Sequence, residues 1–240
     1  MTVPQSFEVR LERARMLSPS VRELVFSRLD GNPLNFVPGQ WVNLMLPHEG
    51  GELKRAYSIA SAPRGESSFE IAVTRVAGGP GSEHLHRLVA GSRIRAVGPS
   101  GLFTREAGDR SPALFVGTGT GVTPLRSMIE AALAAGSDAP LWLLFGVRHE
   151  AEILYREELE RWTAEHPNVR VFVTLSRPTD GWAGRTGYVQ VHLPMVWAEL
   201  ARPDAHVYVC GLERMVKAVR DLCRKDLGID RKHVHQERYD

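Results

Sequence analysis

The sequence predicts two domains, an N-terminal antiparallel β-barrel followed by a Rossmann-like α/β domain with a parallel sheet. Short strand-like segments separated by turns fill residues 1–108, whereas apolar strands alternate with helices over residues 109–240. A glycine-rich turn, Gly117–Gly121, directly follows the first of these later strands. Short strands at this spacing are typical of a barrel, and alternating strands and helices are typical of a parallel sheet.

Five segments of the first domain show apolar and polar alternation or an excess of β-forming residues. Turn signals such as Asp30-Gly31-Asn32-Pro33 and Pro63-Arg64-Gly65 separate them. One short helix is expected at residues 82–88. The strands are expected at residues 7–11, 21–26, 41–46, 69–73 and 93–97.

The second domain opens on an apolar strand at residues 113–116 that leads into the glycine turn. We expect the next helix to be capped by Thr123, to hold Pro124 in its first turn and to end at Gly136. The continuous apolar run at 141–145 suits a strand that is buried on both faces. The remaining expected elements are strands at 169–173 and 205–210 and helices at 150–164 and 213–228.

Composition narrows the classes of protein. The net charge of +2 argues against a nucleic-acid partner. No run approaches the about 18 apolar residues that span a bilayer, and the N-terminus lacks a signal-peptide core, so we expect a cytoplasmic protein with no membrane partner.

Two cysteines, Cys210 and Cys223, are too few for an iron–sulfur cluster. His233 and His235 would share a face of a strand, but no third ligand is evident, and we expect no metal site.

The segment Arg55–Ser61 concentrates a cation, an aromatic ring and two hydroxyls within seven residues. On a strand, Arg55 and Tyr57 would share one face, and Ser58 would lie on the other. A flavin dinucleotide needs a guanidinium for its pyrophosphate, a flat ring for its isoalloxazine and a hydroxyl near its reactive nitrogen. The alternative is an ordinary amphipathic strand.

The glycine turn suits a pyrophosphate. Glycines between a strand and a helix let the backbone approach the anion, and free amides and the helix dipole face it. The spacing departs from Gly-x-Gly-x-x-Gly, because Val122 occupies the last glycine position. The alternative is a tight β–α turn without a ligand.

The pattern Arg-x-Tyr-Ser-x-x-Ser, followed by Gly-Thr-Gly-x-Gly-x-x-Pro, resembles the ferredoxin–NADP(+) reductase superfamily. The resemblance extends from Pro38-Gly39-Gln40 to the C-terminus. It implies FAD in the first domain, NADP in the second, and hydride transfer between nicotinamide and flavin N5. It also implies a separate one-electron carrier, such as a ferredoxin or a flavodoxin.

The resemblance assigns FAD contacts position by position. Arg55 matches the arginine on the pyrophosphate, Tyr57 the tyrosine stacked on the isoalloxazine, and Ser58 the serine that bonds flavin N5. A turn at the predicted start of a helix could also bind phosphate through its amides, the alternative being a plain turn with an N-cap. The other predicted FAD contacts are Ala56, Ser61, Gly79, Gly81 and Ser82.

The resemblance places the NADP pyrophosphate on the glycine turn and the nicotinamide beside Cys210-Gly211. The alternative for Cys210 is a small core residue, but the carboxyl end of a strand favours a ligand contact. The turn residues that would line the pyrophosphate are Gly117, Thr118, Gly119, Thr120 and Gly121.

A 2′-phosphate needs cations and hydroxyls. Family members specific for NADP carry residues similar to Ser176, Arg177, Arg185 and Tyr188, although this chain has one extra residue before the tyrosine. Arg148 is a further candidate, with a solvated loop arginine as the alternative. Charge favours NADPH, and NADH stays open because NADH-using relatives share parts of the same pattern.

Plant-type members of the family end in Glu-x-Tyr, and their terminal ring covers the flavin. Glu237 and Tyr239 match this ending, although Asp240 follows. Tyr239 is therefore either a lid over FAD or an edge aromatic at a frayed end. Glu237 joins Ser58 and Cys210 as a predicted catalytic residue.

Two other functions stay open. The chain could be an NADH-dependent reductase component of an oxygenase or a cytochrome reductase. It could also be a non-catalytic nucleotide-binding regulator on the same scaffold. A regulator need not retain Tyr57, Ser58 and Cys210, so the presence of all three argues against that reading.

Overall fold

The computed structural model describes residues 4–239, which form two compact units. The first unit runs through Ala107 and also contains Arg126–Ala131, a stretch from the middle of a helix. The second unit comprises Gly108–Leu125 and continues from Ala132. The domain boundary at residue 108 stays a prediction of the sequence.

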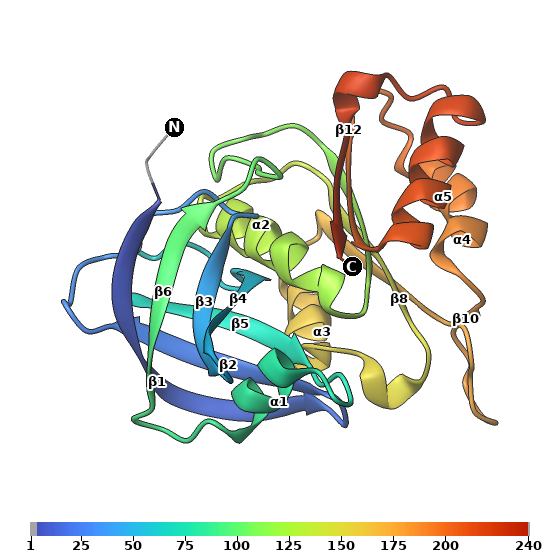
Figure 1. The fold of residues 1–240 in the computed structure, drawn as a ribbon. Helices are drawn as coiled ribbons and strands as arrows, with labels where there is room; N and C mark the ends of the chain where they lie inside the picture. The colour runs from blue at the N-terminus through green and yellow to red at the C-terminus, as the bar shows by residue number, and fades with distance from the viewer. Residues whose placement is uncertain (1–3, 240) are drawn as a thin grey trace. The chain divides into compact units, whose positions relative to one another are not determined.

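The first unit is built on a six-stranded antiparallel sheet with the order β4-β3-β6-β1-β2-β5. Figure 1 shows these strands curled around a common interior, which confirms the predicted barrel. Among the described residues before Ala107, helix α1 spans Pro80–Arg87. The strands are β1 (Gln5–Ser18), β2 (Val21–Arg28), β3 (Trp41–His48), β4 (Gly51–Ser58), β5 (Ser68–Thr74) and β6 (Arg93–Ser100).

The two outermost strands, β4 and β5, are joined by the residues that follow β4. The amide of Ile59 donates to the carbonyl of Gln40 at 2.9 Å, beside the start of β3. The amide of Ala60 donates to the carbonyl of Glu70, in β5, at 2.7 Å. The first bond continues the pairing of β4 with β3, the second reaches β5 at the other edge of the sheet, and the segment thereby closes the barrel.

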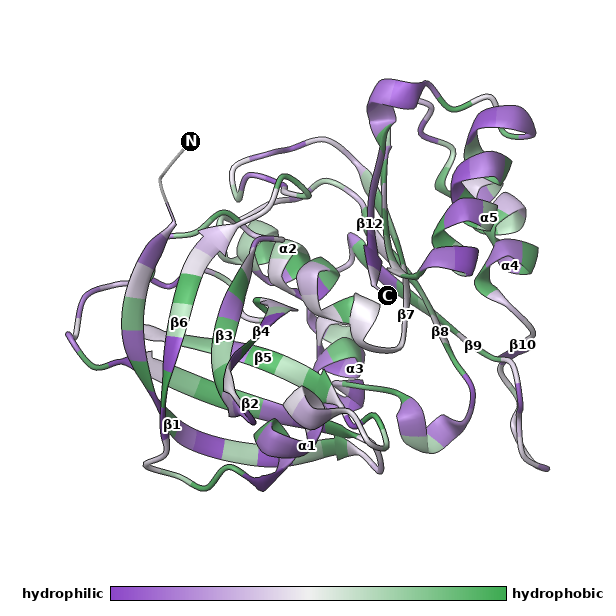
Figure 2. Ribbon diagram, viewed as in Figure 1, coloured by the Kyte–Doolittle hydropathy of each residue, from purple (hydrophilic) through white to green (hydrophobic). Residues whose placement is uncertain are grey.

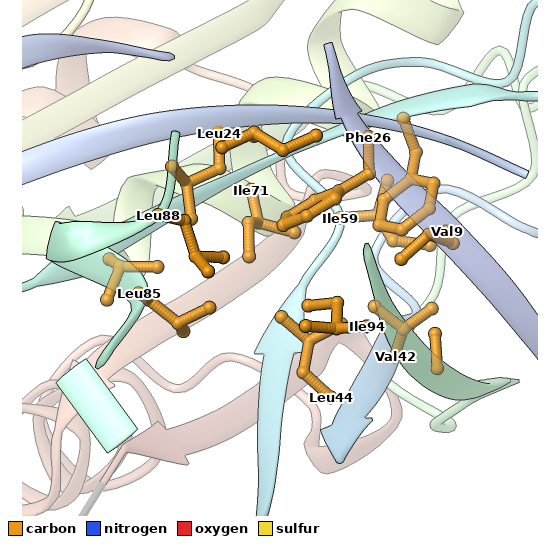
Figure 3. Close-up of a cluster of buried hydrophobic side chains, with 14 of the residues drawn as sticks. Val9, Leu24, Phe26, Val42, Leu44, Ile59, Ile71, Leu85, Leu88 and Ile94 are labelled. Atoms are coloured by element: carbon orange, nitrogen blue, oxygen red, sulfur yellow. The ribbon is translucent and has the colours of Figure 1, made fainter. Parts of the chain in front are cut away.

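The interior of the barrel is apolar because strand residues alternate between its two faces. Figure 2 shows the resulting alternation of hydrophilic and hydrophobic residues along β1 and β6. In Figure 3, Phe26, Ile59 and Ile71 lie together in the interior, and all three are fully buried. The rings of Phe26 and Phe69 stack with centroids 5.9 Å apart. Burial of such side chains is worth about 1.5–3 kcal/mol each and is the main term that stabilises this unit.

The second unit is built on a six-stranded parallel sheet with the order β10-β9-β8-β7-β11-β12, as predicted for a Rossmann-like domain (Figure 1). From β7 the chain proceeds to β8 and β9 on one side, and then returns to β11 and β12 on the other. Ligands bind where the direction of strand addition reverses in this way, here between β7 and β11. The strands are β7 (Ala113–Thr118), β8 (Leu141–Val147), β9 (Val169–Leu175), β10 (Arg185–Thr186), β11 (His206–Leu212) and β12 (Val234–Tyr239).

The α-helices that follow β7 in the described part of the chain are α2 (Val122–Ala134), α3 (Arg156–Glu165), α4 (Val189–Leu200) and α5 (Glu213–Lys225). The expected end of α2 is confirmed, because Gly136 adopts a φ of +70° and donates its amide to the carbonyl of Leu133. The expected cap by Thr123 is wrong. Its hydroxyl donates to the carbonyl of Thr120 at 2.8 Å instead of accepting a helix amide.

Two other expectations about helices differ from the structure. The single helix predicted at 150–164 is two pieces, a 3-10 turn at Glu150–Glu152 and then α3, because Tyr155 takes a left-handed φ of 56° between them. Helix α4 was not predicted at all. It contains Pro194, which lacks an amide and in a sequence signals the end of a helix.

Within residues 4–239, no helix is long and apolar enough to cross a membrane.

Candidate functional site

The end of β4 presents the side chains predicted to hold a flavin. Tyr57 pairs with Val42 of β3 and packs against the apolar core of the barrel. Burial raises the pKa of the Tyr57 phenol to about 12, although the charge of Arg55 opposes the shift. The ring is therefore neutral at physiological pH. Ser58, the last residue of the strand, is only 6% exposed, whereas Ala56 is exposed.

Arg55 lies against the turn that begins α1. A Cβ on Gly81 would be 3.1 Å from Cγ of Arg55, so the glycine makes room for the aliphatic part of that side chain. The N-cap of α1 is Gly79, and no side chain caps the first amides of the helix. The Arg55 guanidinium donates to the carbonyl of Lys54 at 2.9 Å, and no carboxylate of the described chain pairs with it. Free amides beside an unpaired guanidinium fit the pyrophosphate of FAD.

Two serines predicted to contact FAD also bind backbone groups of the protein, and their contact with FAD stays a prediction. The Ser82 hydroxyl accepts from the Val76 amide at 3.0 Å and donates to the carbonyl of Gly79 at 3.1 Å. The Ser61 hydroxyl accepts from the amide of Glu70 at 3.2 Å. Both hydroxyls therefore stabilise the loops that carry them.

The glycine turn of the second unit passes close to the end of β11. Gly117 pairs with Cys210 in the parallel register of β7 and β11. A Cβ on Gly121 would collide with the backbone carbonyl of Cys210, and Gly119 adopts a φ of +54°. The turn therefore requires glycine at both positions.

Thr118 and Gly211 face each other across the same turn. A Cβ on Gly211 would collide with the Thr118 hydroxyl, and the φ of +148° at Gly211 also favours glycine. The Thr118 hydroxyl is buried and has no hydrogen-bond partner within residues 4–239. Buried polar groups are normally satisfied, so this hydroxyl fits a site that a dinucleotide completes.

Cys210, Glu237 and Tyr239 converge beside this turn. Cys210 pairs with Glu237 in the parallel register of β11 and β12. Burial raises the pKa of the Cys210 thiol well above its usual value, the charge of Glu237 raises it further, and a hydrogen bond from Tyr239 opposes both. The Tyr239 hydroxyl also lies 3.4 Å from the hydroxyl of Thr123, in the first turn of α2. Tyr239 thus spans from the predicted nicotinamide cysteine to the helix after the glycine turn.

The loops after β8 and β9 hold the residues predicted for the 2′-phosphate. The amide of Arg177 donates to the carbonyl of Arg148 at 2.8 Å, and that of Ser176 to the carbonyl of Val147 at 3.0 Å. These bonds bring the two loops together at the carboxyl edge of the sheet.

The candidate arginines differ in what their side chains contact. Arg148 pairs with Glu152 at 2.8 Å, and the Arg185 guanidinium stacks 4.7 Å over the ring of Phe172. Arg177 is exposed and pairs with no carboxylate of the described chain. Tyr188 is 63% exposed at the N-cap of α4. Among these candidates, Arg148 pairs with a carboxylate, whereas Arg177 and Arg185 carry no such pairing within residues 4–239.

Sequence reasoning missed a cavity of about 600 Å³ between the same two loops. Two of its lining residues, Ile153 and Arg156, flank the break before α3 that the continuous helical pattern at 150–164 concealed. The cavity is lined by His149, Glu150, Ala151, Ile153, Arg156 and Thr179.

A third histidine lies beside the two singled out in the sequence. The ring of His206 lies 4.6 Å from that of His233 and 5.1 Å from that of His235, between centroids. A hydrogen bond of 2.9 Å joins Nδ1 of His206 to Nε2 of His235. Even so, no group of three metal-ligating side chains within residues 4–239 is arranged to hold a metal ion.

Comparisons with known proteins agree with this division of roles. Residues 8–104 match the family model described as Oxidoreductase FAD-binding domain. Residues 115–221 match the one described as Oxidoreductase NAD-binding domain. The first match includes β4 and the start of α1, and the second includes the glycine turn and Cys210.

Two curated relatives extend over nearly the whole chain. The chain is 58% identical to Ferredoxin--NADP reductase B of Sorangium cellulosum over 244 residues, which covers 100% of both proteins. It is 31% identical to the Toluate 1,2-dioxygenase electron transfer component of Pseudomonas putida, covering 99% of this chain and 69% of that protein.

Solved structures show the same fold. A cytochrome P450 reductase from Amycolatopsis matches with a TM-score of 0.86 and 26% identity, over 99% of this chain and 71% of that one. The ferredoxin-NADP+ reductase of Plasmodium falciparum matches with a TM-score of 0.82 and 21% identity, over 98% of this chain and 96% of that one. The chain is therefore an oxidoreductase that belongs to the ferredoxin–NADP(+) reductase superfamily.

Proposed function

We propose that this protein transfers electrons between NADPH and a separate one-electron carrier through bound FAD. The observation that carries the proposal is the 58% identity, over the full length of both chains, to a protein named Ferredoxin--NADP reductase B. A ferredoxin-type carrier follows from that name. A flavodoxin as the alternative carrier, and a cytoplasmic location, stay predictions of the sequence.

The first unit binds and orients the flavin. Arg55 and the first amides of α1 hold the pyrophosphate, the neutral ring of Tyr57 packs against the isoalloxazine, and Ser58 presents its hydroxyl to N5. FAD, when bound, supplies the exchange between a two-electron hydride and single electrons. The protein contributes the geometry, because hydride transfer requires close alignment of the reacting atoms.

The second unit binds the nicotinamide dinucleotide. The glycine turn and the Thr118 hydroxyl hold the pyrophosphate, and Arg177 holds the 2′-phosphate. Because its pKa is raised, the Cys210 thiol stays neutral and adds no charge beside the nicotinamide. Glu237, its partner in the sheet register, is the remaining candidate for proton transfer at this position.

The second candidate is an NADH-dependent reductase component of an oxygenase. It is favoured by the ion pair of Arg148 with Glu152, because a carboxylate already balances the charge of that candidate for the 2′-phosphate. The 31% identity to the toluate dioxygenase component points the same way. The greater identity to the NADP reductase ranks it second.

Anaerobic stopped-flow measurement of flavin bleaching, with NADPH and NADH at equal concentrations, tests the proposal. We expect NADPH to reduce the flavin faster and the reduced protein to pass electrons to a ferredoxin. A preference for NADH would replace the proposal by the second candidate. Bound nucleotide without flavin reduction would contradict both.

A further inference from the structure

The backbone that follows Ser58 is held by side chains of α2. All of these contacts lie inside the first unit, to which Arg126–Ala131 belongs. β4 ends at Ser58, and three consecutive residues after Ile59 each offer one backbone group to the helix. Arg126 Nη1 donates to the carbonyl of Ala60 at 2.7 Å, the Ser127 hydroxyl donates to that of Ser61 at 2.7 Å, and Glu130 Oε2 accepts from the amide of Ala62 at 2.8 Å.

Glu70 of β5 holds the same segment from the other side. Its carboxylate accepts from Arg126 at 2.8 Å, its carbonyl from the amide of Ala60 at 2.7 Å, and its amide donates to the hydroxyl of Ser61 at 3.2 Å. Arg126 is 5% exposed and Glu70 is 6% exposed. A buried ion pair needs further hydrogen bonds to its members to offset their desolvation, and here both members also bind the segment.

The anchored segment begins two residues after Ser58. Between them, Ile59 is fully buried in the barrel core. The direction of the backbone at Ser58 is therefore fixed from β3 on one side and from the anchored residues on the other. A displacement of this segment would move the Ser58 hydroxyl.

We propose that Arg126 and Ser127 are positioning residues for Ser58, which hold its hydroxyl where flavin N5 is bound. The inference rests on the proposed function, because the proposed function assigns the contact between the Ser58 hydroxyl and flavin N5 that this anchoring serves. Misplacement of a reacting group by about 1 Å can slow a reaction about a hundredfold, so even a partial loosening is measurable.

The flavin-free protein gives the first test, by hydrogen exchange in Ser127→Ala. Ser127 is fully buried, and the substitution removes one hydrogen bond with little change in packing. Ser137→Ala is the matched control, because Ser137 is also buried and its hydroxyl has no partner within residues 4–239. We expect the amides of Ala60 and Ala62 to exchange about fivefold faster in Ser127→Ala and unchanged in the control. Unchanged exchange in both variants would contradict the anchoring.

A double-mutant cycle with Ser58→Ala then tests the positioning role. We expect Ser127→Ala to slow flavin reduction at saturating nucleotide about tenfold, and to have no further effect when Ser58 is already alanine. Equal slowing in both backgrounds would show that Ser127 acts elsewhere, and no slowing would show that Ser58 is placed without it.

The visible absorption spectrum of bound FAD separates this inference from the proposed function. Ser127→Ala should shift the flavin bands in the same direction as Ser58→Ala, and Ser137→Ala should leave them unchanged. If neither nucleotide reduces the wild-type flavin, the proposed function fails, yet the spectral comparison still decides the inference. A wild-type spectrum in Ser127→Ala would overturn the inference.

Discussion

The hydroxyl of Thr118 and the α-carbon of Gly211 meet where β7 and β11 end, so that a side chain on the glycine would collide with the hydroxyl. The hydroxyl is buried and has no partner in the described part of the chain. The protein alone therefore carries an unsatisfied polar group at the point where a parallel sheet of this order binds its ligand.

Thr118→Val tests whether that hydroxyl serves the dinucleotide. Valine keeps the shape of the side chain and removes a buried, unsatisfied group, so we expect the free energy of unfolding to stay the same or to rise by about 1 kcal/mol. Affinity for NADP should fall about tenfold, because one hydrogen bond to an anionic group is lost. Denaturant unfolding and calorimetric titration measure the two effects separately. A loss of stability with unchanged affinity would contradict the assignment.

Ser58→Ala tests the assigned contact with flavin N5. Because the substitution leaves Arg55 and the start of α1 intact, we expect FAD to stay bound. Hydride transfer should slow by about a hundredfold, the usual effect of removing one group that acts on the reacting atoms. Single-turnover flavin reduction measures the rate, and the flavin-to-protein ratio checks the loading. An unchanged rate would refute the role of this hydroxyl.

Substitutions of the arginines predicted to bind the 2′-phosphate are expected to differ in their effect on coenzyme preference. Arg177→Ala should raise KM for NADPH about tenfold and leave KM for NADH almost unchanged, since it removes a charge that only the phosphate requires. Arg185→Ala should have a smaller effect on coenzyme choice, because its guanidinium is stacked on Phe172. Steady-state kinetics with both coenzymes compares the variants. An equal rise in KM for NADPH and NADH in Arg177→Ala would contradict the assignment of Arg177 to the 2′-phosphate.

Features governed by neighbours in the chain were predictable from the sequence. The glycine turn and the alternation of strands and helices depend on local backbone preference, and they led to the correct fold. The break at Tyr155 and the helix containing Pro194 were missed, because tertiary packing overrides the local signal there.

Contacts between segments that are distant in the chain could not be predicted from local sequence patterns. Arg126 follows Glu70 by 56 residues and, on a helix, reads as an ordinary exposed arginine, yet the two form a buried ion pair. The hydroxyls of Ser61 and Ser82 matched a cofactor pattern and are engaged by backbone groups that only the folded loops bring near.

Ending the chain at Arg238 tests whether Tyr239 controls access to the nicotinamide site. Tyr239 contacts both Cys210 and Thr123, so its removal should open the end of β11. Burial is the main cause of the raised pKa of the Cys210 thiol, and greater exposure should lower that pKa. Because the pKa of the Cys210 thiol is raised, the thiol stays protonated at pH values above the usual pKa of a cysteine. The intact protein should therefore be alkylated slowly at pH values where an exposed cysteine reacts.

We therefore expect iodoacetamide to modify Cys210 at least about tenfold faster in the truncated chain. KM for NADPH should fall in the same variant, because the nucleotide no longer has to displace the tyrosine ring. A chain ending at Tyr239 is the matched control, since it removes only Asp240 and should behave as the intact protein. Mass spectrometry of the peptide containing Cys210 follows the modification, and Cys223 serves as an internal reference because it is buried elsewhere, within an apolar cluster. Faster alkylation without any change in KM would make Tyr239 a cover for the thiol and not a lid over the nicotinamide site.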